Sequence, residues 1–466
     1  MPADDVTESP GSAMFVAVGR PTFDLKSGAA LCEGALQLLR RSVPDVIGDA
    51  VALQSPEEIS EHVSGSVVAD LLVVAFATFA DASLSLAALE GAAPTARVVL
   101  WSFPEAAKGG RLQRNSLCGA NLAAFSLGVR GRDVTGIHGH PDDPGTQEDM
   151  SRAIAGWPAT GSAHPQADAF TAAEHAAATR TAQRLGMAHI GIVGEPPPGF
   201  EACDVADDPL VIGTTFQQVA MEDLFDRSAQ VETPVALPHG ATGAEELDPA
   251  ATDRSLRLQG GLSELSDLHD WDAVAVRCWP ECFTQWGGAA CGPLSMLTED
   301  GLPSACEADA FGALTMLMLA EISERPSFLA DLVELDTTTN TAVFWHCGVA
   351  PLSMADPTVP IEVAEHPNRH MPFTVNFGLR PGAVTVARLT RSRGQLRLAV
   401  GAGELLAKPA PFVGTSGVVA METPVDRIYR TVLSEGLEHH YGLAYGDHRR
   451  ALQALAWLWG IEVIDL

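Results

Sequence analysis

Short apolar runs alternate with helix-spaced segments from the N-terminus to about residue 280. Three of these runs, at residues 14–24, 68–81 and 96–105, each end in a turn or a polar exit loop. Between the first two, residues 25–43 repeat Ala, Leu and Cys at helical spacing. Apolar strands connected through helices are typical of a parallel sheet covered by helices on both faces. We therefore expect an N-terminal α/β domain.

The pattern changes twice further along the chain. The Ala-rich segment from Ala172 to Leu185 predicts a helix that bridges two domains, and the apolar runs at residues 187–204 and 271–283 predict strands of a second α/β unit. After about residue 350, apolar and polar residues alternate between short turns, which is typical of antiparallel strands, and a helix and a strand end the chain. The predicted fold is α/β, with two Rossmann-like (flavodoxin-like) parallel-sheet domains followed by a β-rich, barrel-like C-terminal domain. The predicted limits are 1–13 for a disordered acidic N-terminus, 14–165 for the N-terminal domain, 166–322 for the central domain and 323–466 for the C-terminal domain with its terminal helix.

Charge and cysteine content restrict the class of partner. The chain has 466 residues and a formal charge of −30, which argues against nucleic-acid and anionic-membrane partners because both require basic surface. Residues 1–13 have neither the basic nor the apolar region of a signal peptide, and no apolar run reaches the length that a bilayer demands. The eight cysteines contain no CxxC pair and indicate reduced, buried thiols. We expect a cytoplasmic protein that acts on a small molecule.

Acidic residues at the ends of apolar segments are the strongest sign of chemistry in the sequence. Glu307 and Asp309 precede an apolar helical segment, Asp331 follows in FLAD, and His346 lies in FWHCG. Burying an unpaired carboxylate costs roughly several kcal/mol, unless a cation or a hydrogen-bond donor compensates its charge. A hard divalent cation bound by carboxylates and an imidazole would explain the pattern. A helix N-terminus with acids in its first turn and a surface acid further on would explain it equally well.

Further polar and aromatic residues lie where strands are expected to end. Ligands of parallel-sheet folds gather at the carboxyl ends of strands, where Arg20 and Trp101 are expected. Arg20 could equally be a structural arginine. Asn115 precedes an apolar helix and could either contact a ligand or cap that helix. Trp279 and Glu281 belong to a polar-aromatic cluster that follows the predicted strand at residues 271–283.

Four segments together resemble the superfamily of L-fucose isomerase and L-arabinose isomerase, which are metal-dependent aldose–ketose isomerases. GRPTFD at residues 19–24 is similar to the opening of fucose isomerases, and NSLCGANLAAFSLG at residues 115–128 is similar to a segment of their first domain. CEADAFGALTML through FLAD is the most specific match, since fucose isomerases also place Glu-x-Asp before a Gly and an apolar helix. HHYGLAYGDH, near the C-terminus, resembles their His-Gly segment. The resemblance spans most of the chain.

The resemblance implies a metal site with acid–base function. It places Glu307 and Asp331 at the positions of two metal-binding carboxylates that also move the proton, and His440 at the position of the metal-binding histidine. His439 is the alternative if the register differs by one residue, and it is otherwise expected to bind substrate. His346 has no ligand counterpart in fucose isomerases but lies near a further histidine ligand of arabinose isomerases, so we expect a ligand or an orienting residue. The expected ion is Mn²⁺, with Co²⁺ or Mg²⁺ as alternatives.

The reaction itself requires such residues, because moving a carbonyl from C1 to C2 removes a proton beside a carbonyl and leaves an enediolate. A divalent cation stabilises the negative charge on O1 and O2, and carboxylates carry the proton. Arg20, Trp101, Asn115, Trp279 and Glu281 are expected to contact the sugar. Because Glu281 lies where fucose isomerases have a substrate-contacting glutamine, the sugar stays open: L-fucose, arabinose, another deoxy sugar or a sulfonated hexose.

The resemblance also implies a homo-oligomer, a hexamer or a trimer, in which the first domain of a neighbouring subunit closes the site. Two other functions remain open at this point. A non-catalytic sugar-binding module would also have two α/β lobes, but it would not require the acids and His440 to converge. A metal-dependent sugar aldolase or dehydratase would also enolise its substrate, but it would require a phosphate or carboxylate cradle, and no Gly-rich basic loop is evident.

Overall fold

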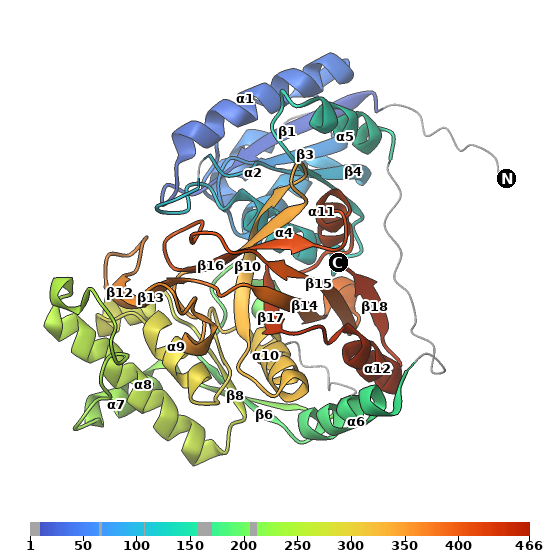
Figure 1. Cartoon of the computed structure of the whole chain (residues 1–466). Helices are drawn as coiled ribbons and strands as arrows, with labels where there is room; N and C mark the ends of the chain where they lie inside the picture. The colour runs from blue at the N-terminus through green and yellow to red at the C-terminus, as the bar shows by residue number, and fades with distance from the viewer. Residues whose placement is uncertain (1–9, 65–67, 107, 157–169, 206–211) are drawn as a thin grey trace.

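The computed structural model describes residues 10–64, 68–106, 108–156, 170–205 and 212–466 (Figure 1). Its first sheet has the strand order β2-β1-β3-β4-β5, and all neighbouring strands are parallel. This is the flavodoxin-like order of doubly wound sheets. The strands are β1 (Ser12–Val18), β2 (Asp45–Ile47), β3 (Ala69–Phe76), β4 (Ala92–Ser102) and β5 (Val134–His138).

Helices cover both faces of this sheet because its strands are apolar on both sides. Phe15 and Ala17 of β1 pack in one buried cluster, and Met14 and Val16 of the same strand pack in another. Capping side chains fix where helices begin, as the Asp24 carboxylate does by accepting the N–H of Ser27 at 3.1 Å. The helices are α1 (Leu25–Ser42), α2 (Pro56–Val63), α3 (Ala82–Ala88), α4 (Ser116–Gly128) and α5 (Pro144–Ile154).

A second, smaller parallel sheet follows with the order β7-β6-β8-β9. The predicted Ala-rich helix is confirmed as α6 (Ala172–Gly186) and leads into this sheet. The strands are β6 (His189–Val193), β7 (Thr215–Val219), β8 (Ala273–Val276) and β9 (Ser304–Ala305). The helices that accompany them are α7 (Met221–Gln230), α8 (Pro249–His269), α9 (Cys291–Glu299) and α10 (Ala310–Ser323).

The third sheet is a nine-stranded sheet that closes on itself. Its order is β12-β13-β16-β11-β10-β17-β14-β15-β18, and the additional pairing of β15 with β16 closes six of these strands into an antiparallel ring. The strands are β10 (Phe328–Asp336), β11 (Thr341–His346), β12 (Glu362–Glu365), β13 (Pro372–Gly378), β14 (Gly382–Thr390), β15 (Arg397–Leu405), β16 (Thr415–Met421), β17 (His440–Tyr445) and β18 (Glu462–Asp465). The last two helices are α11 (Val425–Ser434) and α12 (Arg449–Trp459). The predicted fold class is therefore confirmed, including its barrel-like C-terminal part.

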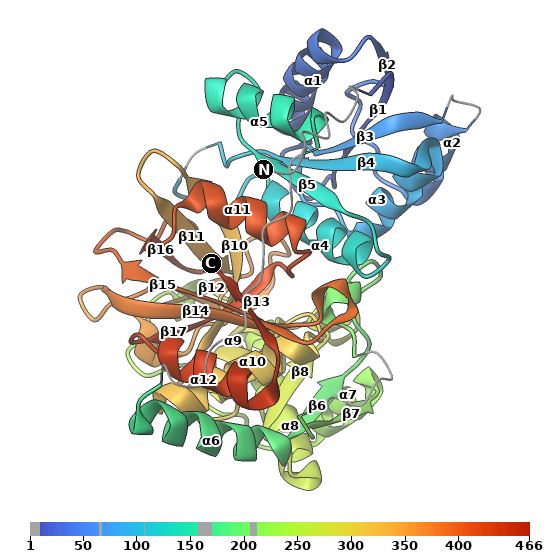
Figure 2. The same ribbon diagram turned by 90° about the vertical axis from the view of Figure 1, so that its right-hand side faces the viewer.

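The barrel lies between the two α/β regions, with the first sheet on one side and the second on the other (Figures 1 and 2). Glu307 and Arg20 each lie two residues after a strand, β9 and β1 respectively, and Asp331 lies within β10 of the barrel. The predicted domain limits stay predictions, and residues 1–9 of the predicted N-terminal segment lie outside the described residues. Within the described ranges, no helix is long and apolar enough to cross a membrane.

Candidate active site

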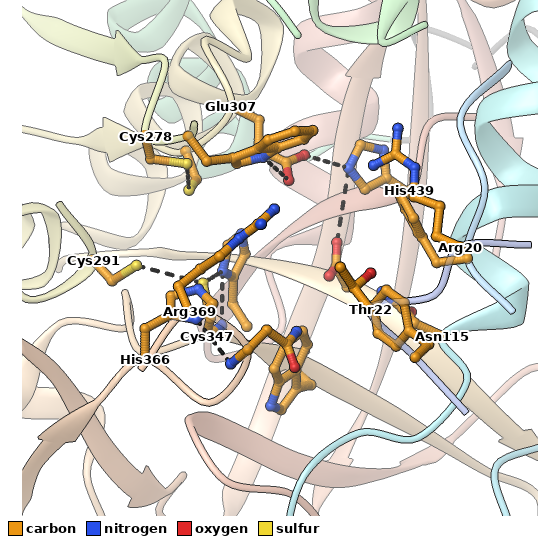
Figure 3. A pocket seen from close by; sticks show the side chains of 18 of the residues that line it. Arg20, Thr22, Asn115, Cys278, Cys291, Glu307, Cys347, His366, Arg369 and His439 are labelled. Atoms are coloured by element: carbon orange, nitrogen blue, oxygen red, sulfur yellow. Dashed lines mark hydrogen bonds and ion pairs between the residues drawn. The ribbon is translucent and has the colours of Figure 1, made fainter. Parts of the chain in front are cut away.

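A cavity lies where the three regions meet, and each region contributes to its wall (Figure 3). The first region contributes Arg20, Thr22, Phe23, Phe79 and Asn115. The second contributes Phe200, Cys278, Trp279, Phe283, Cys291, Cys306 and Glu307. The barrel and its loops contribute Asp331, Trp345, His346, Cys347, His366, Asn368, Arg369 and His439. Half of these side chains are phenylalanine, tryptophan or cysteine, and the other half are polar or charged. Apolar walls with converging polar groups are typical of small-molecule sites.

Two carboxylates of the cavity wall, those of Glu307 and Asp331, converge on the buried imidazole of His440. His440 Nε2 lies 3.4 Å from Asp331 Oδ1 and 3.7 Å from Glu307 Oε2. The barrel brings the first pair together, because Asp331 of β10 is directly opposite His440 of β17 in the antiparallel register. Glu307 enters from the second sheet at the carboxyl end of β9, with the left-handed backbone angle φ of 61°. Side chains more than one hundred residues apart in sequence therefore meet within hydrogen-bonding range or just beyond it.

A buried ion pair fixes the orientation of His440. Asp309 caps α10 and its Oδ2 lies 2.8 Å from His440 Nδ1, while both carboxylate oxygens accept from Arg388 at 2.7 and 2.9 Å. Burial alone would raise the pKa of Asp309, but the Arg388 charge and the His440 hydrogen bond hold it well below its usual range. The ionised Asp309 accepts the proton on Nδ1, so the lone pair of His440 is on Nε2, which faces Asp331 and Glu307. This carboxylate–histidine arrangement is the one that orients metal-binding imidazoles.

The converging atoms fit a divalent cation. His440 Nε2 and Asp331 Oδ1 are both buried without a hydrogen-bond partner among the described residues. Such atoms are costly unless something compensates them. Burial disfavours ionised Glu307, yet the hydrogen bond and charge of His439 lower its pKa to about 2, so a negative charge is maintained there. Two carboxylate oxygens and one imidazole nitrogen are a donor set suited to a hard or intermediate divalent ion.

Comparison of the whole chain with known proteins identifies its family. The model of the L-fucose isomerase C-terminal domain matches residues 346–466. A sulfoquinovose isomerase of Alkalicoccus urumqiensis is 30% identical over 464 residues, covering 98% of this chain and 99% of the relative. Sulfoquinovose isomerases of Priestia aryabhattai and of Clostridium sp. (strain MSTE9) are 29% and 30% identical and are also covered almost completely. The chain belongs to the L-fucose and L-arabinose isomerase superfamily.

It is therefore an aldose–ketose isomerase, as the resemblance implied, and neither the non-catalytic sugar-binding module nor the aldolase or dehydratase is retained. Solved structures add nothing to this conclusion. A C2-type ketoreductase from a modular polyketide synthase covers 67% of this chain at 17% identity with a TM-score of 0.23, and 78% of that ketoreductase is covered. A TM-score this low carries no information about fold or function.

His346 lies beside the proposed ion site, since one of its ring nitrogens, an Asp331 carboxylate oxygen and a ring nitrogen of His440 lie within 4.8 Å of one another. Its Nδ1 accepts the backbone N–H of Cys347 at 2.9 Å. In the neutral imidazole the proton must then be on Nε2, which is buried without a hydrogen-bond partner in the described chain. A protonated nitrogen donates and does not ligate. This tautomer is that of an orienting donor, and the role of His346, ligand or orienting residue, stays a prediction.

Three of the residues expected to contact a sugar line the cavity, and so does His439. Arg20 and Asn115 reach it from the first region, and Trp279 donates its Nε1 proton to Glu307 Oε1 at 3.2 Å. His439 Nε2 lies 3.0 Å from Glu307 Oε2, and its ring centroid lies 3.9 Å from that of His440. His439 is thus the partner of Glu307, whereas the Nε2 atom free of partners belongs to His440.

The structure places Trp101 and Glu281 elsewhere. Trp101 is fully buried within the core of the first sheet and donates its Nε1 proton to the carbonyl of Gly139 at 3.1 Å. It belongs to the body of β4, so it cannot reach a ligand in this cavity. The Glu281 carboxylate accepts from Arg277 Nε at 2.7 Å and is absent from the described lining. Both were expected at strand ends, and sequence position alone did not show which way each side chain points.

The first region of this same chain also lines the cavity. Arg20, Phe79 and Asn115 all line the cavity beside Glu307 and Asp331 of the same chain. The closure of the site by the first domain of a neighbouring subunit stays a prediction. The oligomeric state stays a prediction.

A buried carboxylate pair anchors the loop that carries Asn115. Glu105 accepts the backbone N–H groups of Gln113, Arg114 and Asn115 at 2.6–3.1 Å. Its own N–H donates to Glu334 Oε2 at 2.6 Å, which joins the first region to β10. Burial and the nearby charge of Glu105 raise the pKa of Glu334 to about 7, although the N–H of Glu105 opposes this change.

We expect Glu334→Gln to stabilise the protein at alkaline pH. The folded state holds the Glu334 proton more tightly than the unfolded chain, so stability is lost as the pH rises from about 4.5 through about 7. The amide retains an acceptor for the Glu105 N–H and has no charge to bury. The variant should be more stable than the wild type by about 2–3 kcal/mol at pH 8 and nearly equal at pH 5. Urea unfolding midpoints between pH 5 and pH 8 measure this difference, and parallel pH profiles would contradict it.

Proposed function

We propose that this chain is a divalent-metal-dependent isomerase that interconverts a C6-sulfonated aldose of the sulfoquinovose type and its 2-ketose through a cis-enediolate. The observation that carries the proposal is the convergence of Glu307 Oε2, Asp331 Oδ1 and His440 Nε2, two of them buried without partners. The choice of sugar is supported by the relatives named sulfoquinovose isomerase, which match this chain over nearly its whole length.

Glu307, Asp331 and His440 would hold the ion, and Mn²⁺ fits this oxygen-rich set with one imidazole, with Co²⁺ or Mg²⁺ as alternatives. When bound, such an ion stabilises negative charge on two adjacent sugar oxygens and keeps them on the same side. Asp309 and Arg388 contribute by fixing the His440 ring, since they determine which nitrogen carries its proton.

The two carboxylates move the proton between C2 and C1. Both oxygens of Glu307 already accept hydrogen bonds, from Trp279 Nε1 and from His439 Nε2, which hold the carboxylate in place. One oxygen of the Asp331 carboxylate, Oδ1, would hold the ion, and the other would accept the proton. Asp331 therefore takes the proton from C2 and returns it to C1, while Glu307 with His439 exchanges a proton with the sugar oxygens.

Hydrogen-bond donors and aromatic rings complete the site. His346 lines the cavity, and its Nε2 proton would donate to a sugar oxygen. Asn115 and Arg20 would bind hydroxyl groups from the opposite wall. Phe200, Trp279 and Trp345 line the space between these groups and limit water, which strengthens every electrostatic interaction inside it.

Metal removal tests the proposal directly. We expect dialysis against EDTA to abolish formation of the ketose from sulfoquinovose and Mn²⁺ to restore it, because three of the proposed metal-binding groups otherwise face one another without a cation. Ketose formation is followed by NMR, and metal content by elemental analysis. Full turnover by protein without detectable metal would overturn the metal-dependent mechanism. No turnover of sulfoquinovose or any other aldose by the Mn²⁺-loaded protein would overturn the function as a whole.

A further inference from the structure

A sulfonated sugar presents this chain with an electrostatic problem. The protein has a formal charge of −30, and Glu307 and Asp331 add two carboxylates to the cavity wall itself. Both fields repel an anionic substrate, and a cation bound beside the acids would act at the C1–C2 end of the sugar alone. A local positive group at the far end is therefore required for binding. Among the residues that line the cavity, Arg20 and Arg369 are the two permanent cations.

Arg20 is already neutralised. Its guanidinium forms an ion pair with Asp81 at 2.5 Å, and both side chains are largely buried. The same group lies 5.3 Å from the Phe79 ring centroid and 5.7 Å from that of Trp279, which holds it against an aromatic wall. An arginine fixed in this way suits contact with neutral hydroxyl groups, because its charge is balanced before the substrate arrives.

Arg369 differs from Arg20 in its exposure and in its charge balance, although both lie near the Trp279 ring. It lies in the turn between β12 and β13, is solvent-exposed, and forms no ion pair with an acid in the described chain. Its guanidinium carbon lies 5.5 Å from the Trp279 ring centroid, and Figure 3 shows the side chain directed into the cavity toward the side where Glu307 lies. Arg369 is thus a cation with unused donors at the cavity mouth.

Two neutral donors lie in the same turn. His366 Nδ1 accepts the backbone N–H of Asn368 at 3.1 Å, so the neutral imidazole carries its proton on Nε2. Asn368 lines the cavity beside it. One fork-shaped cation with an imidazole N–H and an amide matches a group with three equivalent acceptor oxygens.

The spacing along the wall also suits a sugar. Trp279 donates to Glu307 Oε1 at 3.2 Å through Nε1, while Arg369 lies over the same indole. One indole ring therefore separates the proposed acid–base end from the free cation. A six-carbon chain lying along this ring would have C1 and C2 near Glu307 and its C6 substituent near Arg369.

We propose that Arg369, with His366 and Asn368 beside it, forms the subsite that binds the anionic group at C6 of the substrate and selects charged over neutral sugars. This inference rests on the proposed function, since it assumes that the C1–C2 end of an aldose lies at Glu307 and Asp331. Its chemistry is shared by a sulfonate and a phosphate ester.

The test compares Arg369→Met with wild type on three sugars: sulfoquinovose, quinovose, which is the same sugar without the sulfonate, and glucose 6-phosphate. All assays use the Mn²⁺-loaded full chain. We expect KM for sulfoquinovose to rise about 10- to 100-fold, the effect of losing a charge-assisted contact, with kcat changed far less. Quinovose kinetics should be unchanged, and Arg369→Lys should recover part of the loss because it keeps the charge.

Arg180→Met is the matched control, because Arg180 is an exposed arginine on α6 outside the cavity. It should leave all kinetic constants unchanged, which excludes an effect of overall charge. Equal losses on sulfoquinovose and quinovose in Arg369→Met would make the residue structural and overturn the inference. Wild-type turnover of quinovose could be too slow to detect. In that case, a lower kcat of Arg369→Met on sulfoquinovose with an unchanged KM would overturn the inference. Greater use of glucose 6-phosphate than of sulfoquinovose would support the subsite and assign it to phosphate.

Absence of turnover by the wild type with every aldose would be a failure of the proposed function. An active wild type whose selectivity survives Arg369→Met would be a failure of this inference alone. The two outcomes are therefore distinguishable in one set of assays.

Discussion

Glu307→Gln is expected to lower kcat/KM by about 10²- to 10⁴-fold, the range typical of a lost acid–base group. The substitution removes the negative charge that faces His440 and leaves an amide where a carboxylate accepts from Trp279 Nε1 and His439 Nε2. The amide nitrogen cannot accept, so one of these two donors loses its partner. Turnover of sulfoquinovose and metal content are measured on the same preparation, which separates lost chemistry from lost metal.

Glu201→Gln serves as the control for this variant. Glu201 is a partly exposed residue that pairs with Arg130 on the surface and does not belong to the described cavity lining. Its kinetic constants should match those of the wild type. Wild-type turnover by Glu307→Gln on every sugar tested would remove Glu307 from the reaction and with it the proposed mechanism.

Arg388→Met is expected to destabilise the protein by about 3–5 kcal/mol, the usual cost of breaking a buried pair on one side. Arg388 is fully buried, binds both oxygens of Asp309, and has its Nε 3.6 Å from Glu438 Oε2. Without it, two carboxylates remain in the barrel interior with no cation. Asp309 would then be more readily protonated and would orient His440 less well, so Mn²⁺ affinity should fall too.

A double-mutant cycle separates these effects. Asp309→Asn combined with Arg388→Met removes the charge that Arg388 compensates, so the double variant should lose less stability than the two single losses combined. Arg449→Met is the matched control, since Arg449 pairs with Glu422 and Asp447 at the surface and should contribute less than about 1 kcal/mol. Urea unfolding of the metal-free proteins measures all four changes. A loss below about 1 kcal/mol in Arg388→Met would contradict the role given to this ion pair.

The spacing of apolar residues along the sequence was enough to predict many of the strands and helices. Apolar runs predicted the strands, and the Ala-rich segment predicted α6, because periodicity reports burial directly. Glu307 and Asp309 could be identified as candidates because acidic residues beside an apolar helix are costly to bury without a partner. The helix N-terminus that we considered as the alternative exists, since Asp309 caps α10. The surface acid of that alternative does not, since Asp331 is buried.

Other parts of the site depend on contacts that no single sequence reveals. Arg388 lies in an alternating strand segment like any other, and its role appears only when β14 places it against Asp309. Arg369 lies in a polar turn whose position over Trp279 follows from the packing of two regions. Trp101 was expected to contact the sugar because it lies near the end of a strand, but its side chain is fully buried in the core.

The closed ring of strands has a consequence for how the protein handles its ion. Asp331 and His440 are on neighbouring strands that are paired on both flanks, so backbone hydrogen bonds fix their separation whether or not a cation is present. Small domains folded by zinc collapse when chelated because nothing else organises their ligands. Here we expect the emptied protein to remain folded, so that repeated cycles of stripping and refilling leave the scaffold unharmed.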